Sequence, residues 1–338
     1  MHRRNPEGRG PGRNRGMALL VVLLILSVMV IIASNMSGRL QLELRRTSNL
    51  TTGKQAWWYA LSAEALVSKI LAQDFKDDPK VVSLGQYWAR KDGVFPVEDG
   101  TLKGEVRDLQ GCFNLNSLSV ARKGDGTEDE ANPPYPVKVF RTLLTLLEVD
   151  EYEAVQLTDA VRDWTDSDTV LVSSYGAEDA YYEGLSQPYL PANQKMLGVD
   201  ELRAVRGVGS ALYARLAPYV CALPNDKLLV NINTIAPEQA ELLAALYLGK
   251  IGVDEARAVL SDRPRKGWQD KQEMTSLPAL AAGAGLTGLN EALGVKSDYF
   301  AAYLLAEVAD TRARLETYFQ RSKENKPVVL RRVNGGAE

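Results

Sequence analysis

The sequence predicts an α+β fold, in which a long N-terminal helix lies on an antiparallel sheet and a large all-helical domain interrupts that sheet. Three observations predict this fold. A helical pattern extends from the apolar segment that begins at Met17 to about Gln73. Strand-like segments occur at 102–115 and again at 297–334, and only short helical patterns occur between Val137 and about Leu293. Strands on both sides of a helical block predict an inserted domain.

The N-terminal segment carries the strongest functional signal. From Met17 to Ala33 the sequence has no charge and one polar side chain, Ser27. That length suits a membrane-spanning helix, whereas a secretory signal has a shorter apolar core with its small-residue cleavage site behind it. Here the small residue, Gly16, precedes the apolar run and follows an arginine-rich leader. The basic leader favours a cytoplasmic N-terminus and an exported body.

Beyond the apolar run, the helix is expected to continue onto the body. No proline occurs between Arg39 and Gln73, and a helix over 17–73 would be about 85 Å long. Its apolar residues recur at three- and four-residue steps as Leu40, Leu44, Tyr59, Ala63, Leu66 and Ile70. The polar stretch 122–136 is predicted to be a loop and a domain boundary. Short helices are expected at 137–148, 151–164, 200–205, 210–218, 236–247, 253–260 and 269–275.

Composition excludes several classes of enzyme. The chain has 338 residues, a net charge of −3 and a single histidine, His2, which lies in the leader. Without that leader, no histidine remains for a Ser-His-Asp or Cys-His centre or for histidine-bound zinc. No nucleophile or substrate groove accompanies the acidic residues in a recognisable pattern, so no enzymatic activity is expected.

The two cysteines, Cys112 and Cys221, admit two interpretations. Disulfides persist in an exported body, which favours a bond between them. Two separate buried thiols are the alternative, because spacing alone does not decide the pairing.

The helical block contains a candidate metal site. Between Asp150 and Asn193 there are ten acidic residues and one basic residue, Arg162. Two acidic pairs stand out ten residues apart, and carboxylates supply the oxygen ligands that Ca²⁺ prefers; these are Asp166 with Asp168 and Glu178 with Asp179. The spacing is not that of an EF-hand. Asp163 is a second-choice ligand or a last-turn residue of its helix, and a solvated acidic face is the alternative to a metal site.

A second motif in this block suggests helix-hairpin-helix units. A turn at 207–209 joins two short helices near Arg203, Arg206 and Arg215, and the segment at 231–246 is a candidate second copy. Such turns bind DNA phosphate in other proteins, but the acidic stretch upstream would repel a polyanion. We therefore expect a packing unit and no nucleic-acid partner. The paired asparagines, Asn114 with Asn116 and Asn231 with Asn233, are expected to cap helices.

The N-terminal layout resembles a type IV prepilin-like signal, in which a prepilin peptidase cuts after Gly16 and Met17 becomes the methylated N-terminus. Pilin-like proteins usually carry Glu at the fifth mature position, which is Val21 here. A carboxylate in the bilayer needs a partner, and a subunit with no predecessor in the fibre lacks one. In lacking this Glu, the chain resembles the protein K family of the type II secretion system, a family of minor pseudopilins. Further family-like strings are QGCFNLNSL (110–118), DWTDSD (163–168), GAEDAYY (176–182) and NINTIAPEQAELLAAL (231–246).

The resemblance implies a pilin-like fold and a function in protein export. It implies a position at the tip of the periplasmic pseudopilus, where the subunit would initiate assembly and limit growth during export across the outer membrane. Implied partners are the other minor pseudopilins, the major pseudopilin fibre and the prepilin peptidase. The implied location is the inner membrane, single-pass, with the body in the periplasm. It also implies Ca²⁺ in the helical domain, with Asp166, Asp168, Glu178 and Asp179 as ligands.

These implications divide the chain into five segments. They are a leader (1–16), a transmembrane part (17–37), a first pseudopilin part (38–121), the inserted helical domain (122–295) and C-terminal strands (296–338). Three alternatives remain open at this point: a plain signal-anchor helix, a DNA-uptake pseudopilin with a helix-hairpin-helix module, and a signal-anchored calcium-binding protein outside any fibre.

Overall fold

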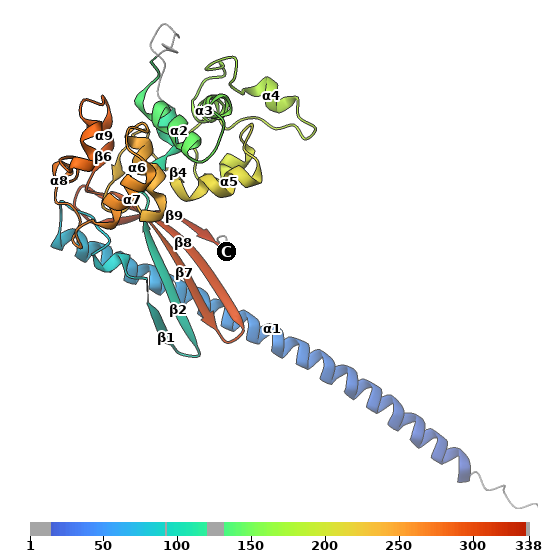
Figure 1. Ribbon diagram of the computed structural model, residues 1–338. Helices are drawn as coiled ribbons and strands as arrows, with labels where there is room; N and C mark the ends of the chain where they lie inside the picture. The colour runs from blue at the N-terminus through green and yellow to red at the C-terminus, as the bar shows by residue number, and fades with distance from the viewer. Residues whose placement is uncertain (1–14, 92, 120–131, 336–338) are drawn as a thin grey trace, which may run out of the picture.

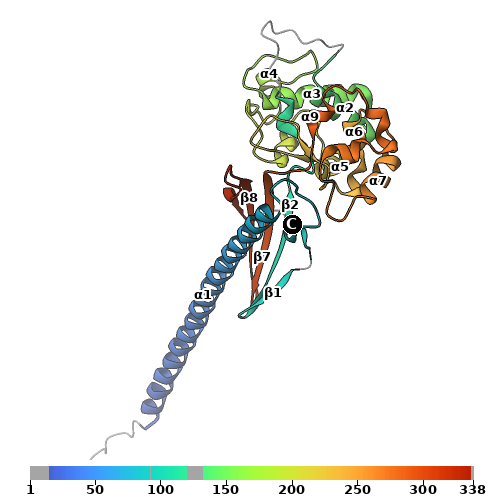
Figure 2. The ribbon, with the colours of Figure 1, turned by 90° about the vertical axis from the view of Figure 1, so that its left-hand side faces the viewer.

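The computed structural model describes residues 15–91, 93–119 and 132–335 (Figure 1). Its first element is one helix, α1 (Arg15–Asp77), which runs four residues beyond the predicted end at Gln73. The N-terminal half of α1 projects away from the body, and its C-terminal half packs on the sheet (Figures 1 and 2). Within the described residues, α1 alone is long and apolar enough to cross a membrane. The predicted leader falls almost entirely outside the described residues.

One antiparallel sheet supports the C-terminal half of α1. Its strand order is β1-β2-β7-β8-β9. α1 buries Ala56, Ala60 and Leu71 against strand residues such as Phe300 and Leu315. The predicted α+β fold is therefore confirmed. The strands are β1 (Val94–Val97), β2 (Gly100–Asp108), β7 (Tyr299–Val308), β8 (Thr311–Arg321) and β9 (Pro327–Asn334).

The prediction that residues 110–115 continue the strand at 102–108 is wrong. The chain turns out of the sheet after Asp108, and β3 (Phe113–Asn114) pairs in parallel with β4 (Val220–Cys221). Phe113 and Leu115 are fully buried in the core of the helical domain, and Leu118 lies in the same core. That core therefore begins ahead of residue 122, where the sequence predicted the boundary. Most of the predicted loop at 122–136 lies outside the described residues.

The helical domain sits at the end of the sheet that is far from the N-terminus of α1 (Figures 1 and 2). Predicted helices at 200–205, 210–218 and 236–247 are wholly or partly 3₁₀. Two short α-helices were not predicted, α4 (Asp179–Glu183) and α9 (Leu289–Ala292). The α-helices are α2 (Tyr135–Leu146), α3 (Glu151–Thr165), α4 (Asp179–Glu183), α5 (Ser210–Leu216), α6 (Ala240–Leu246), α7 (Val253–Ser261), α8 (Lys271–Thr275) and α9 (Leu289–Ala292). The 3₁₀ segments are η1 (Tyr87–Ala89), η2 (Leu115–Leu118), η3 (Val199–Ala204), η4 (Ala217–Tyr219), η5 (Pro237–Gln239) and η6 (Pro278–Gly283).

Two halves of the helical domain repeat one arrangement. Each begins with an asparagine on a two-residue strand that pairs in parallel with the strand closing the same half: β3 with β4, and β5 (Val230–Asn231) with β6 (Leu293–Gly294). In the first half, Asn116 Oδ1 accepts from Met196 N–H (2.8 Å) and its Nδ2 donates to Met196 O (2.9 Å). Asn233 makes the same pair of bonds with Trp268, at 2.7 and 2.9 Å.

We call these paired hydrogen bonds of Asn116 and Asn233 clamps. The repeat continues beyond them in the sequence. Glu201 accepts from the backbone N–H of Leu197, and Glu273 accepts from that of Gln269, each four residues away. The segment at 231–234 therefore corresponds to the segment at 114–117. It does not begin a second copy of the turn at 207–209.

A buried carboxylate joins the two domains. Asp108 ends β2, and its Oδ2 accepts from Asn231 Nδ2 (3.0 Å), Thr234 Oγ1 (2.6 Å) and Ser297 Oγ. The chain leaves the sheet at Asp108 and returns to it just after Ser297. The Asp108 side chain therefore contacts both connections between the domains and also the start of the second half. Burial raises the pKa of Asp108, against the lowering effect of these donors. The hydrogen bonds hold the helical domain in a defined orientation on the sheet.

Candidate metal centre

The loop after α3 is folded by a buried aspartate. Asp163 is fully buried, and its carboxylate accepts from Val172 N–H (2.8 Å) and Ala177 N–H (2.7 Å). A Cβ at Gly176 would run into that carboxylate, so glycine is required where the loop passes it. Asp163 was a second-choice ligand from sequence. In the structure its carboxylate binds the loop backbone, which brings the residues after α3 back toward the start of α4.

This folding places three of the four predicted carboxylates together. One oxygen from each of Asp166, Asp168 and Glu178 lies within 4.8 Å of the others. Asp166 caps the C-terminus of α3, and Glu178 stands at the N-cap of α4. Asp179 is the first residue of α4 and does not belong to this group. The two acidic pairs therefore converge, but one member of the second pair stays outside the cluster.

Glu178 is the most informative residue of the cluster. Its side chain is 5% exposed, and neither carboxylate oxygen has a hydrogen-bonding partner among the described residues. Burial, and then repulsion from Asp163, Asp166, Asp179 and Asp168, raises its pKa to about 8. A buried carboxylate without a donor is costly. A divalent cation would satisfy it and would offset the repulsion, so these residues fit a hard cation such as Ca²⁺.

Aromatic residues pack together next to the acidic loop. The sequence analysis did not identify them as part of the site. Trp164 and Tyr182 are buried, with ring centroids 5.4 Å apart, and Tyr189 packs on Tyr182 at 5.2 Å. Arg206 Nη1 donates to Gly176 O (3.0 Å), and the guanidinium lies 4.7 Å from the centre of the Tyr181 ring. The string GAEDAYY contained a signal for this packing, because Tyr181 and Tyr182 follow the acidic pair after a single alanine.

The three arginines considered for phosphate binding are engaged within the domain. Arg206 holds Gly176 as described, Arg203 stacks on the Tyr213 ring at 5.2 Å, and Arg215 Nη1 donates to Leu147 O (2.9 Å). Gly207 adopts φ +82° in the turn, as a tight connection requires. The motif packs the domain, and these contacts do not favour the DNA-uptake alternative.

The cysteines and asparagines have structural positions. The structure has a disulfide between Cys112 and Cys221, with Cα atoms 5.8 Å apart across 109 residues of sequence. It lies beside the β3–β4 pair, at the base of the first half. Asn114 caps η2 as predicted, through the N–H of Asn116. Asn231 Oδ1 accepts in the same way from the N–H of Asn233. All four side-chain amides go beyond the predicted capping, because each also bonds backbone or a side chain distant in sequence.

Comparisons with known proteins agree with this architecture. Two family models described as type II secretion system protein K match residues 111–225 and 230–296, which correspond to the two repeated halves. The chain is 72% identical to type II secretion system protein K of Aeromonas hydrophila, over 96% of this chain and 98% of that protein. It is 38% identical to the protein K of Dickeya chrysanthemi, with the same coverage.

A solved structure shares most of this arrangement. It is a chain in the crystal structure of the GspK-GspI-GspJ complex of the enterotoxigenic Escherichia coli type 2 secretion system. The match has a TM-score of 0.78 at 32% identity, and it covers 86% of this chain and all of that one. The long helix, the sheet and the helical domain therefore occur together in a solved relative.

Proposed function

This chain belongs to the type II secretion system protein K family of minor pseudopilins, and from that premise we propose that it occupies the tip of a periplasmic pseudopilus. There it would initiate assembly and limit growth during export across the outer membrane. The family is a structural component of secretion machinery. The proposed work of the chain is therefore assembly and not catalysis.

The position of the helical domain is the observation that carries this proposal. Pilin-like subunits stack through their long helices, and the helical domain covers the end of the sheet farthest from the N-terminus of α1 (Figure 2). A subunit added above would meet this domain. The hydrogen bonds of Asp108 favour a fixed domain over one that swings aside. Val21 supports the same position, because a first subunit needs no Glu to pair with a predecessor.

The proposed partners are other minor pseudopilins, by analogy with the complex in which the relative was solved. In the structure, some apolar residues of α1 are buried and others are exposed. Ala63 is buried against the chain's own sheet, whereas Leu66 is 43% and Trp58 66% exposed. Residues 58 and 66 are eight apart, so they lie on one side of the helix. We assign this side of α1 to a neighbouring pseudopilin, and the major pseudopilin fibre would follow below.

The membrane steps of the proposal rest on the N-terminal segment. Prepilin peptidase would cut after Gly16, Met17 would be methylated, and the apolar half of α1 would hold the chain in the inner membrane. The exposed apolar residues along this half, such as Leu24 and Val30, suit a lipid environment. The leader charge would place the body in the periplasm, where a disulfide such as Cys112–Cys221 persists.

Calcium is the proposed ligand of the acidic loop. Asp166, Asp168 and Glu178 would provide three protein ligands, and loop carbonyls and water would complete a coordination of six to eight oxygens. Asp179, predicted as a ligand from sequence, would contribute to the field of the site. The ion would hold the loop between α3 and α4 on the domain surface.

Gel filtration tests the assembly proposal. The chain, purified with the periplasmic domains of the other minor pseudopilins, should co-elute with at least one of them. Trp58→Arg combined with Leu66→Arg should abolish co-elution, because charges would be buried in the contact. The matched control is Leu190→Arg with Leu197→Arg, which alters two exposed apolar residues of the helical domain. Separate elution of the unaltered chain from every minor pseudopilin would contradict the proposal.

A further inference from the structure

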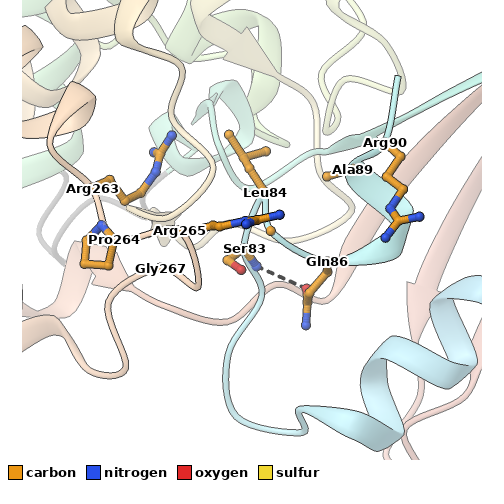
Figure 3. A pocket seen from close by; sticks show the side chains of 10 residues that line it. Ser83, Leu84, Gln86, Ala89, Arg90, Arg263, Pro264, Arg265 and Gly267 are labelled. Carbon is orange, nitrogen blue, oxygen red and sulfur yellow. Dashed lines mark hydrogen bonds between the residues drawn. The ribbon is translucent and has the colours of Figure 1, made fainter. Parts of the chain in front are cut away.

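A cavity at the junction of the two domains is lined by arginines (Figure 3). It has a volume of about 350 Å³ and lies between the segment that follows α1 and the loop that follows α7. Ser83, Gln86 and Arg90 line it from the pseudopilin domain, and Arg263 and Arg265 line it from the helical domain. Among the residues that the structure describes, none that lines the cavity is acidic.

Two of the three arginines present their charge to this space. Arg265 forms no ion pair with any residue that the structure describes, and its side chain extends toward Ser83 and Leu84 (Figure 3). The Arg90 guanidinium lies 4.4 Å from the centre of the Tyr87 ring, and its charge also interacts with the buried carboxylate of Asp74. Contact with a ring face leaves the N–H donors at the edge of the guanidinium available. Arg263 differs, because its Nη1 donates to Ile235 O (2.7 Å).

The backbone fixes the arginine loop in place. A Cβ at Gly85 would run into the carbonyl oxygen of Arg265, so the two segments approach as closely as glycine permits. Gly267 adopts φ +74°, and a Cβ there would lie 2.6 Å from the Asn233 side chain. Next to it, Trp268 is held by the two hydrogen bonds of Asn233. A preorganised loop loses little entropy when its side chains bind a ligand.

The repeat places this loop in correspondence with the acidic loop. In the first half, the segment between α3 and the clamp at Met196 contains Asp166, Asp168 and Glu178. In the second half, the segment between α7 and the clamp at Trp268 begins with Asp262 and then contains three basic residues, Arg263, Arg265 and Lys266. The same position of the unit thus carries a cluster of negative charge in one copy and of positive charge in the other.

The position of the cavity limits the class of anion. About 43 helical residues separate the apolar run from the end of α1, which puts the cavity about 65 Å from the bilayer. Lipid headgroups therefore do not reach it, and a cavity of about 350 Å³ admits single side chains and not a nucleic-acid duplex. Guanidinium groups bind carboxylates with paired, charge-assisted hydrogen bonds.

We propose that this cavity binds the carboxylate side chains of an acidic segment of another protein, with Arg90 and Arg265 as the binding groups. Docking there would bridge both domains of this chain at their junction. The proposal rests on the membrane anchor that the proposed function assigns to α1, and not on calcium or on the tip position.

Fluorescence anisotropy of a labelled hexaglutamate peptide, titrated with the full chain in detergent and calcium-free buffer, tests the proposal. Arg90→Gln with Arg265→Gln should weaken binding at least tenfold. The control, Lys250→Gln with Lys323→Gln, removes the same charge from exposed sites elsewhere and should change binding less than twofold. Arg90→Lys with Arg265→Lys should bind with intermediate affinity, because charge remains and paired geometry is lost. Melting curves of all variants verify that they fold.

Three outcomes would overturn the proposal. If the control substitutions lower the affinity for the peptide as much as the Arg90 and Arg265 substitutions do, the attraction is nonspecific. If the Arg90 and Arg265 variant binds the peptide as tightly as the unaltered chain does, the peptide binds at another site. In a competition arm, inorganic phosphate that displaces the peptide at lower concentration than free glutarate would identify a small-anion site instead. Displacement only by carboxylates, with hexaglutamate stronger than glutarate, supports a protein segment.

Discussion

At the scale of single residues, the candidate metal centre depends on Glu178. The other two carboxylates of the cluster are more exposed, and Asp168 Oδ1 accepts from Val170 N–H (2.9 Å). Glu178 is buried and has no hydrogen-bond donor among the described residues, and Asp163, Asp166 and Asp168 surround it with like charge. We therefore expect Glu178 to lower the free energy of unfolding of the calcium-free chain, and it is the strongest candidate to bind the ion.

Because Glu178 would destabilise the calcium-free chain and also bind the ion, Glu178→Gln should have two effects of opposite sign. The calcium-free variant should be more stable than the unaltered chain by about 1–3 kcal/mol, because a repelled buried carboxyl group is removed. It should also lose the stabilisation by Ca²⁺, which is about 2.7 kcal/mol at a hundredfold excess over Kd. Melting curves with calcium and with EDTA measure both effects.

The control for this experiment is Glu183→Gln, an exposed residue at the end of α4. It should leave the calcium response intact, and Asp166→Ala with Asp168→Ala should abolish the response. Identical melting curves of the unaltered chain with calcium and with chelator would refute the metal centre.

Gly16 carries the second prediction at this scale. Only a small side chain fits beside the bond that a prepilin peptidase cuts, so Gly16→Glu should leave the leader attached and block assembly. Mass spectrometry of the chain from a host with its prepilin peptidase should find a methylated Met17 as the N-terminus of the unaltered protein. Gly16→Ala, a smaller change, is the control. An intact leader on the unaltered chain would favour a plain signal anchor.

At the scale of elements, an ion pair holds α1 to the sheet. Glu64 on α1 is buried, and its carboxylate accepts from Arg332 Nε (2.7 Å) and Nη2 (2.8 Å) on β9 and from Thr317 Oγ1 (2.8 Å) on β8. Burial opposes the charge, but the bonds with Arg332 and Thr317 outweigh it and lower the pKa of Glu64. The helix, the edge strand β9 and its neighbour β8 thus meet at one carboxylate.

Glu64→Gln should therefore destabilise the chain by about 1–3 kcal/mol at pH 7. Because the pKa in the folded state is lowered, the stabilisation by Glu64 is present above the unfolded value near 4.5 and is lost as pH falls through the folded value. Urea unfolding should show a large difference between variant and unaltered chain at pH 7 and a smaller one under acid conditions. Glu43→Gln, which breaks an exposed pair with Arg46 on the same helix, should have little effect. A difference in unfolding free energy that does not depend on pH would argue against this ion pair.

At the scale of the whole molecule, the helical domain is an insertion between two paired strand ends. Asp108 is the register partner of Phe300, and Leu109 N–H donates to Tyr299 O (3.0 Å). The sheet is therefore complete without the residues between them. The domain adds a second core, a disulfide and the acidic loop above a self-sufficient pilin-like base.

Replacing residues 110–298 by an Asn-Gly turn should leave the helix and sheet folded, because that turn suits adjacent antiparallel strands. Membrane insertion should persist, whereas fibres should lose their defined ends, since the block above the sheet is gone. Electron microscopy of fibre lengths measures this, with the unaltered chain and a vector without the gene as references. Fibres of unchanged length would mean that the helical domain does not limit growth.

Much of this architecture was predictable from local patterns. The apolar run, the helix over 17–73 and the strands near 299–308, 311–321 and 327–334 each depend on the periodicity of neighbouring residues, and the structure contains all of them. The acidic pairs were visible for the same reason. Residues 110–115 misled the prediction, because their alternating pattern continues that of β2 while their burial is determined by a different core.

Tertiary structure alone decided the rest, since contacts between distant residues leave no periodic trace in one sequence. The position of Asp163 under the loop, the exclusion of Asp179 from the cluster and the burial of Glu178 all follow from how α3 and α4 pack. The bonds of Asn116 to Met196 span 80 residues, and the arginine cavity joins segments far apart in the chain. The sequence by itself determined the elements and the chemistry available, and only packing decided which side chains meet and which are removed from water.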